Sequence, residues 1–131
     1  MSHPGLPCPF CTLQPEATVA GNALAVAVYD GFPVSPGHAL IIPRRHIASL
    51  FEATADERGA LLDLLAETRG LLLQRFHPDS FNIGINDGPA AGQTVMHLHI
   101  HLIPRYGGDT ADPRGGVRWI MPEKAPYWKK K

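Results

Sequence analysis

The stretch MHLHIHLI at residues 96–103 determines how the rest of the chain is interpreted. Histidine alternates with an apolar residue three times, and Pro104 follows the run. Strict alternation is typical of a half-buried β-strand, because successive side chains point to opposite faces of the sheet. We expect the apolar residues between and after the histidines to face the core. The other face then carries a row of imidazoles roughly 6–7 Å apart: His97, His99 and His101.

Three imidazoles in one row indicate a chemical site rather than a solvated surface. Histidine is the commonest metal ligand, and its charge changes near neutral pH. A neutral imidazole can also attack phosphorus and form a covalent intermediate. The row therefore predicts either a metal site or a site that handles phosphate groups.

Length and composition limit the other possibilities. A chain of 131 residues is expected to form a single domain over 1–131. Its 12 basic and 12 acidic residues balance, with a pI near 7.1, which argues against nucleic acid as a partner. The sequence has no apolar run of membrane-spanning length and no recognisable signal peptide, so we expect no membrane association and a cytoplasmic location.

The remaining patterns predict an α+β fold, with an antiparallel sheet that carries a helix on one face and the histidines on the other. Thr54 and Glu57 form a capping-box pattern at the start of a long helix. Both ends of the chain, 1–21 and 107–131, lack clear periodicity and are interpreted as an irregular arm and a tail. The expected elements are strands at 24–29, 38–42, 80–85 and 96–103, and a helix at 55–75.

The only two cysteines, Cys8 and Cys11, lie in the N-terminal arm as Cys-x-x-Cys. This spacing is typical of half a metal site or of a redox pair. Two unligated thiols are the third possibility. A closed zinc site would need two further ligands, and spacing alone does not choose them among the seven histidines.

The connector before the histidine row is rich in turn residues. Gly88 and Gly92 would let backbone N–H groups approach an anion, and Gln93 and Thr94 add side-chain donors. A loop of donors beside a nucleophile is what phosphate chemistry needs. His99, which has a histidine on either side, is our candidate nucleophile.

Four segments together resemble the histidine triad (HIT) superfamily. HLHIHLI at 97–103 resembles its signature, and PGHALIIP at 36–43 resembles its upstream strand. DGPAAGQTV at 87–95 resembles the fragile-histidine-triad branch, and DPRGGVRW at 112–119 resembles bacterial members. The resemblance implies a HIT-like antiparallel sheet of about five strands with one long helix and a short one. It also implies a homodimer with a ten-stranded arrangement.

The same resemblance implies roles for individual residues. A nucleotide would be attacked at its α-phosphorus by His99, with His101 contacting the phosphoryl oxygens and His38 supporting the triad. The residues implied to bind nucleotide or phosphate are Asp30, Asn86, Gly92, Gln93 and Thr94. In zinc-bearing members a structural zinc is held by a Cys-x-x-Cys and two histidines. The matching residues here are Cys8, Cys11, His46 and His97.

The resemblance favours a nucleotide hydrolase, with dinucleoside polyphosphates such as diadenosine polyphosphates as substrates. An adenosine phosphoramidase, a phosphorylase or a nucleotidyltransferase fits the same residues. A nucleotide-binding or sensing module with incidental turnover is a different class. A purely structural zinc protein, with the whole triad as ligands, is disfavoured because the residues of one strand face are too widely spaced for one tetrahedral ion.

Overall fold

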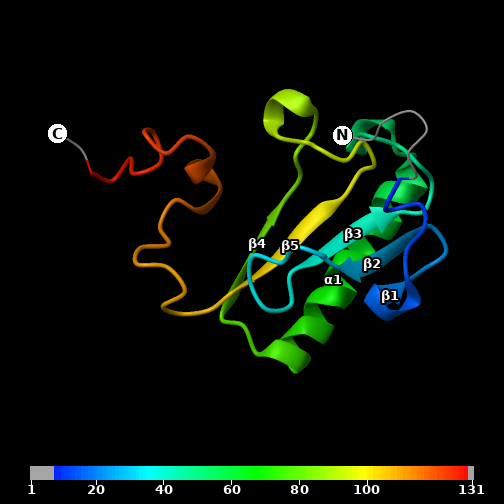
Figure 1. Cartoon of the computed structure of the whole chain (residues 1–131), viewed down its shortest axis with the longest axis horizontal. Coiled ribbons are helices and arrows are strands. Elements are labelled where there is room, and N and C mark those ends of the chain that lie inside the picture. Colours follow the sequence, from blue (N-terminus) through cyan, green and yellow to red (C-terminus); the bar gives the residue numbers. More distant parts are fainter. Residues whose placement is uncertain (1–7, 130–131) are drawn as a thin grey trace.

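The computed structural model describes residues 8–129, and its centre is a five-stranded antiparallel sheet (Figure 1). The strands lie in the order β1-β2-β3-β5-β4, so the fifth strand along the chain is inserted between β3 and β4. This insertion brings the histidine segment beside residues that are distant in sequence. The strands are β1 (Thr18–Gly21), β2 (Ala25–Tyr29), β3 (Ala39–Pro43), β4 (Ser80–Gly84) and β5 (Ile100–Arg105).

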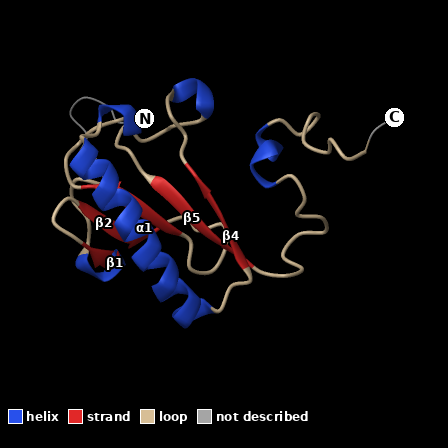
Figure 2. Ribbon diagram, turned by 180° about the vertical axis from the view of Figure 1, so that it is seen from behind, coloured by secondary structure: helices blue, strands red, loops and turns tan. Residues whose placement is uncertain are grey.

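One long helix, α1 (Ala55–Phe76), covers a single face of the sheet (Figure 2). Its predicted start is confirmed: the Thr54 hydroxyl accepts from the Glu57 N–H at 3.1 Å, and the Glu57 carboxylate accepts from the Thr54 N–H at 2.9 Å. The helix ends at Phe76, and the next residue, His77, caps it in the left-handed conformation with φ 55°. The helix and the sheet enclose a core that includes Ala25, Ala27, Ile41, Leu61, Leu64 and Ile100.

The other helical segments are short 3-10 turns. They are η1 (Pro15–Ala17), η2 (Leu50–Glu52), η3 (Pro89–Ala91) and η4 (Gly116–Ile120). Among the residues that the structure describes, no helix has the length and apolar character needed to cross a membrane.

The predicted histidine strand is shorter than expected. β5 begins only at Ile100, where its ladder to β3 starts opposite Ile41. Before that point the Leu98 N–H donates to the carbonyl of Ile47 at 2.6 Å, outside the sheet ladder. The prediction of one row of imidazoles along a strand is therefore wrong for the first two histidines. The prediction that Leu98, Ile100 and Leu102 face the core is confirmed, since each is at most 3% exposed.

The irregular N-terminal arm was expected to extend to residue 21, but its last four residues form β1. The strand is a short edge strand with an irregular register at Thr18 and Ala20, and its small side chains give no alternation to detect. Residues 1–7 of the predicted arm lie outside the described part of the chain, as do residues 130 and 131 of the tail. The rest of the tail contains η4, so it is not entirely irregular.

Candidate functional site

Three polar side chains meet on the sheet face opposite α1. Asp30 follows β2, His38 precedes β3 and His101 lies on β5. His38 Nε2 is 3.0 Å from His101 Nδ1 and 3.4 Å from Asp30 Oδ2. Antiparallel pairing explains the meeting, because Tyr29 pairs with Ala39 across β2 and β3, which places the ends of these strands together.

A backbone donor fixes the tautomers of this pair. The Val34 N–H donates to His38 Nδ1 at 3.1 Å, so this nitrogen is an acceptor and the His38 proton lies on Nε2. That proton faces His101 Nδ1, which must accept it, and the His101 proton is then on Nε2. The arrangement leaves His101 with an N–H donor directed away from His38.

The pKa shifts of His38 and His101 agree with uncharged imidazole rings. Burial, followed by the neighbouring imidazoles of His99 and His38, lowers the pKa of His101 to about 4, and the carboxylate of Asp30 opposes this effect. Burial also lowers the pKa of His38, again opposed by Asp30. At neutral pH His101 is therefore an uncharged hydrogen-bond donor.

His99 is oriented by its own segment. Its Nδ1–H donates to the carbonyl of His97 at 2.8 Å, so Nε2 carries the lone pair of the neutral ring. The His99 ring is half-buried between the rings of Phe10 and His101, whose centroids lie 5.0 and 5.1 Å away. A held imidazole with a free lone pair has the geometry of a nucleophile or a base.

The turn-rich connector folds on itself. Gly88 and Gly92 both have φ of 99°, a conformation that favours glycine, and they flank η3. The Gly88 N–H donates to Gln93 Oε1 at 2.8 Å, while Gln93 Nε2 donates to the carbonyls of Ala48 and Val95 at 2.9 and 3.1 Å. The buried Gln93 amide thus fixes the shape of the loop.

This bonding pattern bears on the expected phosphate donors. Besides Gly88, the N–H of Gly92 is also bonded inside the loop, to the carbonyl of Pro89 at 3.0 Å. The N–H groups of Gly88 and Gly92 and the Gln93 amide are therefore already hydrogen-bonded to groups of the protein. That they bind phosphate stays a prediction. Asn86 and Thr94 are exposed, so their side chains are accessible to a ligand.

A cavity of about 1220 Å³ opens beside the paired imidazoles. His38, His101, Asn86 and Gly92 line one part of it, together with residues of β4. The C-terminal tail, including Trp119, lines another part. The two expected nucleotide-binding residues Asn86 and Gly92 are therefore placed with the imidazoles, around one open space.

A second cluster forms where the N-terminal arm meets the segment before β5. The Sγ of Cys8 is 3.4 Å from His97 Nδ1, and the Sγ of Cys11 is 3.2 Å from His46 Nδ1. The two Nδ1 atoms are 3.1 Å apart. Both cysteines are free thiols, so they form no disulfide. The structure brings together all four residues that the resemblance implied.

The chemistry of this set fits a metal ion. A tetrahedral zinc with ligands at about 2.0–2.3 Å separates its ligand atoms by about 3.3–3.8 Å, close to the distances found here. The buried His97 ring donates its Nε2–H to the carbonyl of Pro43 at 2.8 Å, which leaves Nδ1 as the ligand atom. Four donors within 4.8 Å of one another could hold one metal ion. Of the triad, only His97 belongs to this cluster, and His99 and His101 stay outside it.

The segment that carries His46 is tied to the helix. Two hydrogen bonds, of 3.0 and 2.8 Å, join the neighbouring Arg45 to the Glu57 carboxylate at the start of α1. This guanidinium is the main cause that lowers the pKa of Glu57 to about 2. The pair restrains the backbone next to one candidate ligand.

Some groups at the two clusters and the cavity were not predicted from the sequence. Phe10 packs edge-on against the rings of His97 and His99, and its position within the Cys-x-x-Cys was the only signal for it. The Val34 N–H and the Pro43 carbonyl set tautomers of ring nitrogens, and backbone groups give no sequence signal. Trp119 is a tail residue that the sequence pattern could not assign to a site.

The fold and the two clusters define an α+β domain in which an imidazole site adjoins a Cys2His2 metal-ligand set. The HIT domain family matches residues 12–108, and the chain belongs to this family.

Relatives and solved structures show the range of the family. The chain is 41% identical over 98 residues to the bifunctional bis(5'-adenosyl)-triphosphatase/adenylylsulfatase FHIT of Arabidopsis thaliana, covering 74% of this chain and 54% of that protein. It is 35% identical over 92 residues to an AP-4-A phosphorylase of Mycobacterium tuberculosis, covering 70% of this chain and 47% of that protein. The chain therefore spans about half the length of these two curated relatives. A Zn-bound histidine triad family protein from Mycobacterium smegmatis superposes with a TM-score of 0.67 and 30% identity, covering 73% of this chain and 70% of that one.

Proposed function

We propose that this protein is a nucleotide hydrolase that forms a nucleotidyl intermediate on His99. The observation that carries the proposal is the bond from His99 Nδ1–H to the His97 carbonyl, because it leaves the Nε2 lone pair free to attack. In the first step Nε2 bonds to the α-phosphorus, and the bond to the bridging leaving-group oxygen breaks. Water then attacks the same phosphorus, which releases the nucleoside monophosphate, a proton and the neutral imidazole.

The other residues of the site hold the phosphoryl group and the nucleotide. We assign to His101 a hydrogen bond from Nε2–H to a phosphoryl oxygen, because His38 occupies its other nitrogen. His38 is a positioning residue that acts through His101. We assign Asp30 to the ribose hydroxyls. The exposed donors near the loop, Asn86 and Thr94, and the turn at Gly92 are assigned to the phosphates, with Gln93 holding the loop in shape.

A dinucleoside polyphosphate, in particular a diadenosine polyphosphate, is our first choice of substrate. The Arabidopsis relative is named a bis(5'-adenosyl)-triphosphatase, and the mycobacterial relative is named an AP-4-A phosphorylase. An adenosine phosphoramidase is the second candidate, because the same attack would release an amine. A phosphorylase would use inorganic phosphate where the hydrolase uses water, and a nucleotidyltransferase would use another acceptor. A nucleotide-binding or sensing role with incidental turnover remains the alternative class.

We further propose that the Cys2His2 set binds a structural zinc ion. The ligand distances, the fixed His97 tautomer and the Zn-bound relative support this assignment. Zinc bound there would crosslink the arm with Cys8 and Cys11 to the segments with His46 and His97. A reducing compartment such as the cytoplasm suits this site, because both thiols must stay unoxidised to bind metal.

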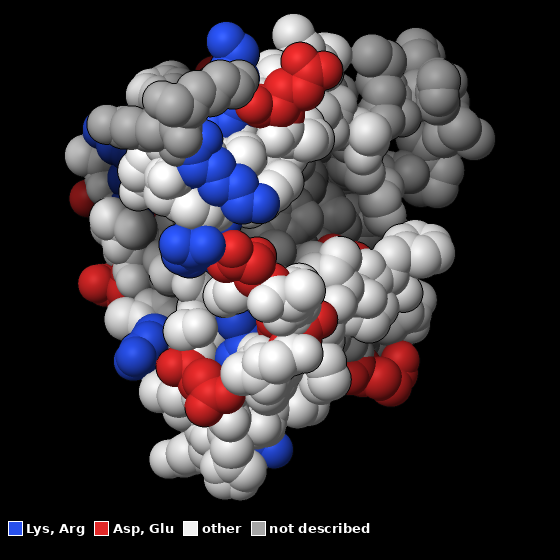
Figure 3. All heavy atoms as spheres, turned by 90° about the vertical axis from the view of Figure 1, so that its left-hand side faces the viewer, with Lys and Arg blue, Asp and Glu red and all other residues white. Residues whose placement is uncertain are grey.

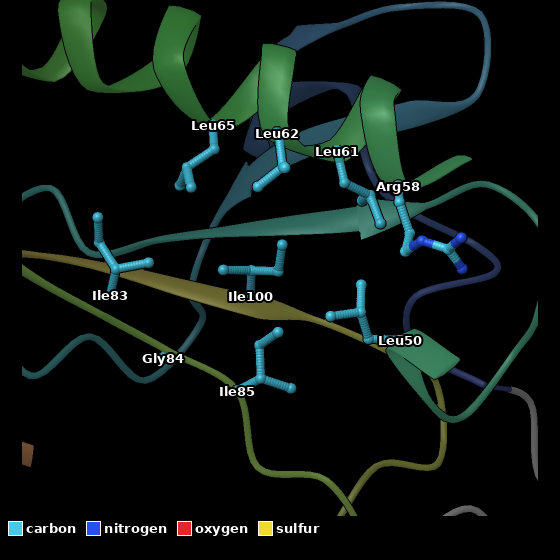
Figure 4. Close-up of a pocket in the computed structure, with 9 residues that line it drawn as sticks. All are labelled: Leu50, Arg58, Leu61, Leu62, Leu65, Ile83, Gly84, Ile85 and Ile100. Carbon is cyan, nitrogen blue, oxygen red and sulfur yellow. The ribbon is translucent and has the colours of Figure 1, made fainter. Parts of the chain in front are cut away.

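The edge of the sheet supports a homodimer. Strand β4 is one of the two edge strands, and beside it lies an apolar pocket of about 300 Å³ (Figure 4). Leucines of α1 line the pocket from above, and Ile83 and Ile85 line it from below (Figure 4). Leu62 and Ile83 are 62% and 46% exposed. No other described strand pairs with this edge of β4, and an edge beside exposed apolar side chains is suited to pairing with a second copy.

Leu62→Glu is expected to convert the dimer into a monomer, because burying a carboxylate in the apolar interface costs more in lost hydration than the neighbouring Arg58 returns. Light scattering after gel filtration measures the mass directly. Phe32→Glu is the matched control, since Phe32 is 91% exposed in the β2–β3 turn and lines neither pocket. A monomeric wild-type chain, or a dimeric Leu62→Glu variant, would contradict this interface.

A turnover panel tests the proposed reaction. Wild-type protein is incubated with diadenosine triphosphate, diadenosine tetraphosphate and an adenosine phosphoramidate, each with and without inorganic phosphate. We expect AMP from a diadenosine polyphosphate without added phosphate. ADP formed from the tetraphosphate only in the presence of phosphate would identify a phosphorylase instead. No turnover of any substrate, with AMP still bound, would favour the binding module.

A further inference from the structure

The tail after β5 forms an ordered structure beside the sheet, although its sequence shows no periodicity. Arg114 donates to Asp112 at 2.9 Å and lies over the Trp128 ring at 4.6 Å. Arg118 donates to the carbonyl of Lys124 at 2.6 Å, and its guanidinium lies 4.7 Å from the Tyr127 ring centre. These contacts fold 112–128 into a unit that can present a surface.

Two consecutive glycines let this unit approach β4. Gly115 and Gly116 have φ of 93° and 44°, a region that disfavours other residues. A Cβ on Gly116 would lie 3.1 Å from Asn82 Nδ2 of β4, and one on Gly115 would lie 3.1–3.3 Å from atoms of both tail tryptophans. The close approach places η4 against β4, which borders the cavity beside the paired imidazoles. In Figure 1 the tail, coloured orange to red, extends past β4.

The tail forms one wall of the cavity that also contains the paired imidazoles. Among the cavity-lining residues, Val117, Trp119, Ile120 and Met121 come from the tail, and His101 comes from the sheet. The Trp119 ring is fixed, because its Nε1–H donates to the carbonyl of Arg114 at 2.8 Å, yet it is 44% exposed. A fixed, accessible aromatic ring is suited to stacking with a flat ligand group.

The charges on this wall do not suit a free anion. Arg105 is the one Lys or Arg among the described residues that line the cavity, and two bonds of 2.8 Å pair it with Asp109. Asp112 is paired in the same way with Arg114. On the face shown in Figure 3, acidic and basic side chains are interspersed, with no large patch of one sign. The tail end of the cavity therefore favours an uncharged, flat group over a phosphate chain.

We infer that the tail, through Trp119, binds the second nucleoside of a dinucleoside polyphosphate, the one that departs with the leaving group. The inference rests on the proposed function and assigns a residue to the second half of its substrate. Asp30 follows β2, and β3, β5 and β4 lie between that strand and the tail in the order of the sheet. If the reacting nucleotide lies toward Asp30, the leaving group therefore extends across β5 and β4 toward the tail. A cavity of about 1220 Å³ exceeds the roughly 300–1,000 Å³ typical of a site for one small ligand. Trp119 is thus a specificity-determining residue.

The test compares two substrates that share the reacting half. Trp119→Ala is expected to lower kcat/KM for diadenosine triphosphate about tenfold or more, the effect of one lost base–aromatic stack. Turnover of an adenosine phosphoramidate, whose leaving group is ammonia and does not reach the tail, stays unchanged. Trp119→Phe restores most of the diadenosine activity. Glu123→Ala is the control in the same segment, because this exposed tail residue lies outside the cavity lining.

Gly116→Ala gives an independent second test, since its Cβ would crowd the Asn82 side chain of β4 and the φ of 44° is strained for alanine. It should reproduce the selective loss of diadenosine triphosphate turnover. An equal loss for both substrates, no loss in Trp119→Ala, or the same loss in Glu123→Ala would overturn the inference while the proposed function stood. If the wild type hydrolysed neither substrate, the proposed function itself would fail.

Discussion

His99→Ala is expected to lower kcat for the preferred nucleotide conjugate by at least about a thousandfold, while the affinity for AMP changes only a few-fold. The variant removes the one nitrogen placed to attack phosphorus, so no covalent intermediate can form. It leaves the paired imidazoles of His38 and His101 and the loop held by Gln93 in place. Steady-state kinetics and calorimetric titration with AMP measure the two quantities separately.

A matched control shows that the effect belongs to the site. His77 is exposed at the C-terminal end of α1 in the left-handed conformation, which asparagine tolerates. His77→Asn should therefore keep wild-type turnover. Rapid quenching of the wild type should also trap a nucleotidyl adduct on His99, detectable by mass spectrometry. Wild-type rates in His99→Ala would mean that another residue is the nucleophile.

The double variant Cys8→Ser, Cys11→Ser is expected to lose one zinc ion per chain and to unfold at a lower temperature. A structural zinc would contribute its binding free energy to folding, so we expect the free energy of unfolding to fall by several kcal/mol. The arm loses its crosslink to His46 and His97, and the Phe10 contact with His99 loses its anchor. Elemental analysis and thermal denaturation provide the readouts.

Chelation separates loss of metal from loss of the thiols. A strong zinc chelator should destabilise the wild type to about the level of the double variant and should have no further effect on the variant itself. Thr12→Ser serves as the matched control in the same arm, because it keeps both thiols and the hydroxyl that donates to the Cys8 carbonyl. Zinc that persisted at one equivalent in the double variant would exclude this site.

The sequence predicted the regular elements where side-chain periodicity is strong. The bounds of α1 follow from its capping box and its leucines, and the valine-rich β2 was expected within one residue. β1 was missed because its four residues are small and its pairing is irregular. The histidine strand was drawn too long, because alternation cannot reveal that the Leu98 N–H bonds to Ile47 instead of to a strand.

Some residues of the candidate site could be chosen from the sequence pattern, whereas others needed the family resemblance. His99 and the Cys-x-x-Cys followed from residue types and spacing alone. The choice of His46 and His97 among seven histidines needed the family resemblance, because those partners lie 35 and 89 residues from the cysteines that they contact. The sequence could not show that the Gln93 side-chain NH2 is already hydrogen-bonded, since its acceptors are the backbone carbonyls of Ala48 and Val95.

His97 contributes to both clusters through different atoms. Its ring faces the two cysteines, and its backbone carbonyl holds the ring of His99. The His97 ring also donates to the Pro43 carbonyl, so it fixes the backbone whose carbonyl orients His99. For protein engineering, a metal-free version of the proposed enzyme should therefore be sought by redesigning Cys8, Cys11 and His46. A replacement at residue 97 would keep the carbonyl, but it would remove both a proposed metal ligand and the side-chain bond that holds this backbone in place.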